Sequence, residues 1–190
     1  MTSMPYRRKR EGKTDYKKRL RLLVSAMPRL VVRKSNRNIS VQLVDYSPDG
    51  DVVVCAASSC KLKKYGWKVS RSNLPTAYLT GLLLGKLAKQ KKIKEAVLDL
   101  GLYPSTKGSR VYACLKGVLD AGIYVPHSAD ILPSEDRIKG GHIAGYAKQI
   151  RNEQERFKLH FGNYEKEKIE PEQLEKYFAK AKEQIQNENK

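Results

Sequence analysis

The spacing of apolar residues changes along the chain between positions 30 and 122, and this change restricts the fold more than any other sequence feature. Residues 30–33, 39–46 and 51–57 are short and rich in β-branched residues. The stretches Ser-Asn-Arg-Asn and Ser-Pro-Asp-Gly, both typical of turns, separate them. Three strands joined by short turns predict an antiparallel meander.

After the meander the apolar spacing becomes helical. Ser72 or Asn73 can cap a helix that continues to about Gln90 and is rich in Leu and Ala. Gly81 and Gly85 share one face of this helix. Because glycine has no side chain, we expect this face to approach the sheet closely.

The next segments return to a strand pattern and then to a helical one. Residues 96–100 predict a buried strand, Ser109 can cap a second helix that ends at Gly122, and residues 123–125 predict a short final strand. The order of elements is therefore βββαβα(β). It predicts a single α/β domain in which the meander continues into a mixed sheet packed by helices.

Two extensions flank this domain. We assign residues 1–27 to a basic arm with a short helix, 28–126 to the α/β core and 127–190 to a helical C-terminal extension. In the extension, a helix from Ser134 to about residue 150 is weakened by its central glycine pair, and a last helix begins near Pro171. The last helix has an apolar stripe at Leu174, Tyr177, Phe178, Ala181 and Ile185. This stripe needs a surface to pack on, either in this domain or on a partner.

The arm carries nine basic side chains between positions 7 and 21. Residues 1–13 contain too few apolar residues to fold alone. Thr14 can then cap a short helix that we expect to end by Pro28. One apolar stripe on this helix, through which it could dock, comprises Tyr16, Leu20, Leu23, Val24 and Met27.

The net charge of +18 belongs entirely to the first 150 residues, because residues 151–190 hold nine basic and nine acidic side chains. Such an asymmetric field predicts a polyanionic partner, and nucleic acid is the natural one. No apolar run reaches the ~20 residues that a membrane-spanning helix needs, so we expect no membrane association. Three cysteines without close spacing predict neither a disulfide framework nor a zinc site.

No catalytic constellation is apparent. The three histidines lack metal-ligand spacing and have no nucleophile beside them. The carboxylates are not gathered at strand ends as a metal-dependent nuclease requires. We therefore predict no enzyme activity, no metal site and no cofactor.

Binding residues are easier to identify, because RNA recognition uses cations for phosphates and planar groups for exposed bases. The arm offers Tyr6, Arg7, Arg8, Lys9, Arg10, Lys13, Tyr16, Lys17, Arg19 and Arg21. The first hairpin loop offers Lys34, Ser35, Asn36 and Arg37, and the segment before the first long helix offers Lys64, Trp67 and Lys68.

Several of these segments occur together in one known family. The motifs are RRKREGKTDY at 7–16, RLVVRKSNR at 29–37, VCAASS at 54–59, KYGWKV at 64–69, AYLTGLLLG at 77–85, GSRVYACLKGVLDAG at 108–122, PHS at 126–128 and HIAGY at 142–146. Together they resemble the universal eighteen family of large-subunit ribosomal proteins, which bind 5S rRNA. The chain lacks the insertion near residue 93 of eukaryotic members, and is therefore most similar to the archaeal form.

The resemblance implies a structural protein of the cytoplasmic ribosome. Its partners would be 5S rRNA, the large-subunit rRNA and neighbouring large-subunit proteins, with the arm and the first hairpin making much of the RNA contact. Two alternatives stay open from the residues alone. One is a nucleic-acid enzyme of the ribonuclease-H-like class, which has a similar element order, and the other is a general nucleic-acid-binding protein.

Overall fold

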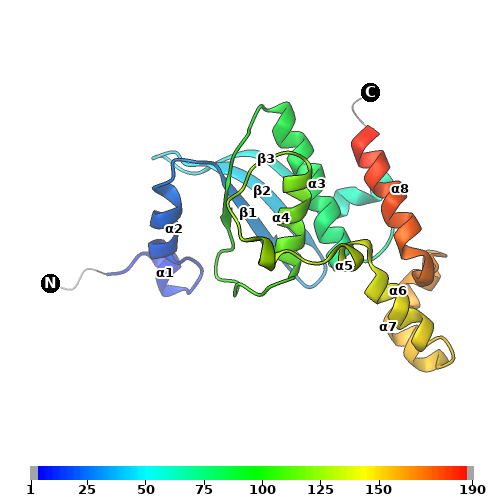
Figure 1. The fold of residues 1–190 in the computed structure, drawn as a ribbon. Helices are drawn as coiled ribbons and strands as arrows, with labels where there is room; N and C mark the ends of the chain where they lie inside the picture. The colour runs from blue at the N-terminus through cyan, green and yellow to red at the C-terminus, as the bar shows by residue number, and fades with distance from the viewer. Residues whose placement is uncertain (1–3, 188–190) are drawn as a thin grey trace.

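The computed structural model describes residues 4–187 and contains one four-stranded sheet with helices on one face (Figure 1). Its strands are β1 (Arg29–Lys34), β2 (Ile39–Asp45), β3 (Val52–Ser58) and β4 (Val97–Asp99). The order across the sheet is β3-β2-β1-β4. The first three strands are antiparallel and β4 runs parallel to β1. The predicted meander and mixed sheet are confirmed.

Two helices, α3 (Leu74–Gln90) and α4 (Arg110–Asp120), cover one face of the sheet. The side chain of Asn73 caps α3 by accepting from the amide of Thr76. Gly81 and Gly85 of α3 were predicted to approach the sheet closely. This prediction was wrong, because they approach α4 instead. A Cβ on Gly81 would lie 2.0 Å from the carbonyl oxygen of Cys114 in α4.

The later strand predictions were too long. Only three residues of the segment 96–100 form β4, and residues 123–125 form no strand. A single bridge joins Glu95 and Tyr124. Ile123 and Val125 are nevertheless buried. Their apolar character therefore reflects packing into the core rather than pairing in the sheet.

The C-terminal extension is helical and packs on the core. Its elements are η2 (Ala129–Ile131), α5 (Glu135–Lys139), α6 (Gly141–Gln149), α7 (Gln154–Lys166), η3 (Pro171–Gln173) and α8 (Leu174–Asn187). Gly140, with a φ of 93°, breaks the predicted helix 134–150 into α5 and α6. The sequence patterns did not reveal α7.

Helix α8 docks on this same domain, which answers the question left open by its apolar stripe. Leu174, Phe178 and Ile185 are buried in the same core cluster as the sheet residues. The Phe178 ring meets the Trp67 ring edge-on, with 6.4 Å between centroids. In Figure 1 the arm and α8 lie at opposite ends of the molecule. The division into arm, core and extension as separate domains stays a prediction.

Candidate nucleic-acid interface

The basic arm forms two short helices, α1 (Arg7–Arg10) and α2 (Tyr16–Leu23). A helical turn at α1 was not expected from composition. The cap of α2 is Asp15 rather than the predicted Thr14, because the Asp15 carboxylate accepts from the amides of Lys17 and Lys18 at 3.0 and 3.1 Å. The Thr14 hydroxyl instead accepts from Nε of Arg8 at 2.9 Å.

The predicted docking stripe of α2 is borne out only in part, because Tyr16, Leu23 and Met27 are half-buried and the other two members are exposed. Leu20 is 66% exposed and Val24 is 80% exposed, and no residue of either arm helix is buried. The helix ends at Leu23, several residues before Pro28, where Ser25 donates to the carbonyl of Leu22. Apolar packing of the arm is therefore partial, and no apolar side chain of its two helices is fully buried.

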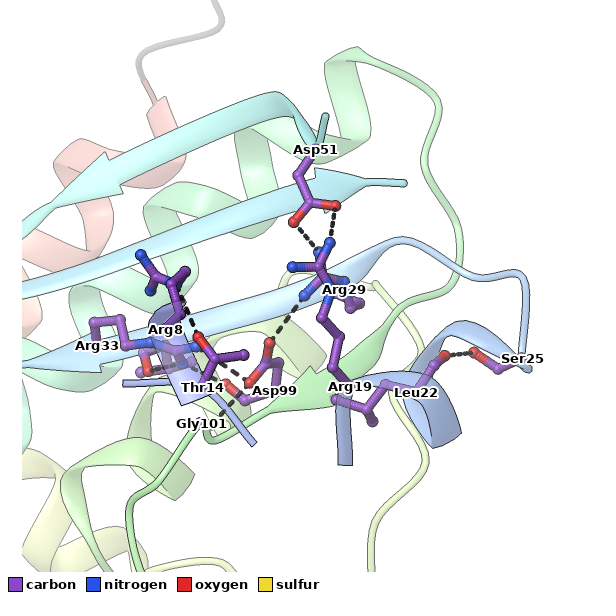
Figure 2. Close-up of polar contacts among 11 residues, drawn as sticks. Arg8, Thr14, Arg19, Leu22, Ser25, Arg29, Arg33, Asp51, Asp99 and Gly101 are labelled. Carbon is purple, nitrogen blue, oxygen red and sulfur yellow. Dashed lines mark hydrogen bonds and ion pairs between the residues drawn. The ribbon is translucent and has the colours of Figure 1, made fainter. Parts of the chain in front are cut away.

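An ion pair from Arg19 also joins α2 to a network of arginines and carboxylates at the sheet (Figure 2). Asp51 accepts from Arg19 of α2 at 3.0 Å and from Arg29 of β1 at 2.6 Å. Asp99, at the end of β4, pairs with Arg29 and with Arg33, each at 3.2 Å. Three arginines thus share two carboxylates, which leaves an excess positive charge beside the arm.

The sequence patterns missed Arg29 and Arg33 as members of a site. The sequence did contain a signal for this pair, because two arginines four positions apart on one strand point to the same face of the sheet. The partner Asp99 is 70 residues from Arg29 in the chain, so its part required the fold.

A groove of about 690 Å³ lies between the arm and the sheet face that α3 and α4 leave uncovered. Its basic lining residues are Arg8, Lys13, Lys18, Arg19, Arg21, Arg29 and Arg33. Its acidic lining residues are Asp15, Asp51 and Asp99. Seven basic side chains against three acidic ones make the groove suited to an anion.

The tip of the β1–β2 hairpin forms a second cationic region. Ser35, Asn36 and Arg37 are exposed there. Nζ of Lys34 lies 5.1 Å from the centre of the Tyr103 ring, a cation–π distance that orients the lysine. The thiol of Cys60 in η1 (Ser59–Tyr65) donates to the Asn38 side chain at 3.2 Å and so joins the hairpin to η1.

Of the three residues predicted after this hairpin, the structure exposes Lys64 and Lys68 but buries Trp67. Trp67 is 1% exposed and its indole N–H donates to the hydroxyl of Thr76 at 2.7 Å. The prediction of a nucleic-acid contact by this ring is corrected, because an indole inside the core cannot stack on a base.

Between positions 4 and 187, no group of three or more His, Cys, Asp and Glu side chains could hold a metal ion. Burial raises the pKa of the Cys55 and Cys114 thiols, which favours their protonated form. None of the helices in the same range is long and apolar enough to cross a membrane.

Comparison with known proteins identifies a matching family and close relatives of this chain. The family model described as "Ribosomal large subunit proteins 60S L5, and 50S L18" matches residues 3–95 and 85–128. The chain is 51% identical to the large ribosomal subunit protein uL18 of Korarchaeum cryptofilum, over 95% of this chain and 92% of that protein. It is 47% identical to the protein of the same name from Methanococcus maripaludis, over 97% and 95% of the two chains.

Proposed function

Since this chain belongs to the family of large-subunit ribosomal proteins 60S L5 and 50S L18, and is therefore a structural protein of the large ribosomal subunit, we propose that it binds 5S rRNA and helps to attach it to the large rRNA. It would do so in the cytoplasm, among neighbouring large-subunit proteins. The family resemblance supports the choice of 5S rRNA as the ligand, and the geometry of the chain supports the proposed mode of binding.

One observation supports this mode most directly: the arm is strongly basic, and no residue of its two helices is buried. Its exposed ion pairs are local, since both Arg7 and Lys13 pair with Glu11, at 3.1 and 2.8 Å. Pairs this exposed contribute little stability, so RNA phosphates can replace Glu11 at small cost. The arm cations are thus available for a polyanion.

The proposed contacts neutralise the RNA backbone and sense its shape. The rings of Tyr6 and Tyr16 lie 5.0 Å apart and Tyr6 is 71% exposed, which suits stacking on an unpaired base. At the hairpin, Asn36 and Arg37 stand free of the sheet and can reach a phosphate or a 2′-hydroxyl. The proposed contact residues are the sixteen of the sequence analysis that remain after Trp67 is removed.

The test is a binding titration with 5S rRNA, compared with tRNA and duplex DNA of matched length, over a range of salt concentrations. We expect a preference for 5S rRNA that persists at physiological salt. In the triple variant Arg7→Ala, Arg8→Ala and Arg10→Ala, affinity should fall and the slope of log affinity against log salt should decrease by up to about 3.

A matched control removes three exposed lysines from the C-terminal helices, Lys158→Ala, Lys166→Ala and Lys180→Ala. It changes the net charge equally, so it should leave the salt slope much closer to that of the wild type. Equal binding to all three nucleic acids would favour a general nucleic-acid-binding protein instead. Divalent-metal-dependent cleavage of RNA would favour the ribonuclease-H-like alternative.

A further inference from the structure

A second groove, of about 420 Å³, lies in the C-terminal extension and is lined by residues of α7 and η3. Its apolar lining is Phe157 of α7 and Pro171 of η3. Pro171 is buried and Phe157 is half-buried. In Figure 1, α7 lies at the other end of the molecule from the arm. This C-terminal groove is therefore separate from the cationic surface that carries the proposed RNA contacts.

The charge of the C-terminal groove is opposite in sign to that of the arm. Three carboxylates line it, those of Glu165, Glu170 and Glu172, against two cations, Arg151 and Lys158. Arg151 is already paired with Glu172 at 2.9 Å. Glu165 is exposed and takes part in no ion pair among residues 4–187. Such a surface repels the phosphates of RNA and attracts a cationic ligand.

The aromatic wall of this groove is supported by the core. Phe157 packs against Phe161, with 5.2 Å between ring centres, and Phe161 packs against Tyr164 at 5.4 Å. Phe161 and Tyr164 are both buried in the common core cluster. The exposed part of the Phe157 ring is therefore held before any ligand arrives, which lowers the entropic cost of binding.

An aromatic ring beside carboxylates suits arginine in particular. The planar guanidinium stacks on an aromatic face and also forms paired hydrogen bonds with a carboxylate. Phe157 and Glu165 are eight positions apart on α7, which corresponds to a rise of about 12 Å along the helix. About four residues of extended chain span this distance, so one short segment can reach both ends of the groove.

We propose that the C-terminal groove holds an extended, arginine-containing segment of another protein. One arginine stacks on Phe157, and further basic side chains meet the carboxylates of Glu165 and Glu170. Basic segments of this kind are typical of proteins that bind nucleic acid. The choice of partner rests on the proposed function, which places this chain among neighbouring large-subunit proteins, and the inference adds the surface that would receive one of them.

Two neighbouring carboxylates provide a matched test. Glu165 and Glu167 are both exposed, but only Glu165 lines the groove. Glu165→Lys and Glu167→Lys change the net charge of the protein equally. Binding of each protein to fluorescein-labelled nona-arginine is measured by fluorescence anisotropy, with nona-lysine and an oligouridylate as further probes.

We expect the wild-type protein to bind nona-arginine in spite of its own net charge of +18, and more tightly than nona-lysine, because an ammonium group cannot stack as a planar ion. Glu165→Lys should lower affinity for nona-arginine at least about fivefold relative to Glu167→Lys. Phe157→Ala should lower it about threefold relative to Leu159→Ala. Leu159 is 79% exposed and lies outside the groove. Folding of each variant is checked by the fluorescence of Trp67.

Equal affinities of Glu165→Lys and Glu167→Lys for nona-arginine would overturn the site. Binding of nona-lysine as tight as that of nona-arginine would overturn the assignment to arginine. If Phe157→Ala weakened binding of the oligouridylate instead, the groove would belong to RNA and the proposal of a protein segment would be wrong. Failure of the proposed function looks different, since the wild-type protein would then show no preference for 5S rRNA, whatever the variants do with nona-arginine.

Discussion

Trp67 illustrates how a single buried side chain can position exposed ones. Its ring lies in the core between η1 and α8, with an edge-on contact to Phe178 and a hydrogen bond to Thr76. Lys64 and Lys68, three residues before and one after, remain exposed. The tryptophan therefore anchors the segment from which the two lysines reach solvent.

A Trp67→Phe substitution separates these roles. We expect the free energy of unfolding to fall by about 1–3 kcal/mol, because the smaller ring leaves space and the indole hydrogen bond is lost. Affinity for 5S rRNA should be unchanged. Urea denaturation followed by circular dichroism gives the first quantity and a titration gives the second.

Lys68→Ala is the control, and its stability should stay within about 0.5 kcal/mol of the wild type because the side chain is exposed. If Trp67→Phe weakened RNA binding without lowering stability, the ring would contact RNA after all and the core assignment would be wrong.

At the scale of elements, α3 and α4 approach each other closely at their glycines. Gly81 of α3 faces the backbone of Cys114, and Gly117 of α4 faces the backbone of Tyr78, where a Cβ would lie 2.2 Å from the carbonyl oxygen. The Cys114 thiol donates to the carbonyl of Ala77 at 3.0 Å across the same contact. The two helices can lie this close only because neither glycine has a side chain.

Gly81→Ala should therefore be destabilising, although alanine normally favours a helix. We expect a loss of about 1–3 kcal/mol or more, since the new methyl group meets backbone that cannot move aside easily. Thermal unfolding measured by circular dichroism would detect it.

The matched control is Gly162→Ala in α7, where a Cβ would meet nothing within 4 Å. This substitution should stabilise the protein by roughly 0.5–1 kcal/mol through the helix preference of alanine. Similar melting temperatures for the two variants would contradict the close helix contact.

Over the whole molecule, the N-terminal arm and the C-terminal helix α8 differ in how much of their surface they bury in the core. The arm helices bury no side chain, whereas α8 buries Leu174, Phe178, Ala181 and Ile185 in the common core. Lys86 of α3 also donates to the carbonyls of Ile185 and Gln186 at the end of α8. The C-terminal helix is thus part of the fold, and the N-terminal arm is an attachment to it.

Deletions should expose this difference. Removal of residues 1–13 should leave the melting temperature within a few degrees of the full chain. Removal of residues 170–190 should abolish cooperative unfolding, because each large apolar side chain of α8 contributes about 1.5–3 kcal/mol to a total stability of only about 5–15 kcal/mol.

Both deletions can be followed by circular dichroism and by the emission of Trp67, the single tryptophan. Loss of α8 should shift this emission to the red, since Phe178 no longer covers the ring. A cooperative transition in the chain without α8 would show that the extension is an independent unit.

Local sequence patterns were sufficient to predict much of the fold of this protein. The three strands of the meander, the extents of α3 and α4, and the concentration of positive charge before residue 150 could all be read from the sequence. These properties depend on spacing and turn chemistry within a few residues. The motifs between residues 7 and 146 likewise pointed to the ribosomal family that the comparisons found.

Other properties depended on residues that are distant in the chain, and only the tertiary structure decided them. Asp99 meets Arg29 across 70 positions, and Phe178 meets Trp67 across more than a hundred. The same sequence signals, an aromatic ring among lysines or an apolar stripe on a helix, led to burial for Trp67 and α8 but to exposure for Leu20. Composition describes what a side chain can do, but which side chains come to share a core or a groove depends on how the whole chain closes on itself.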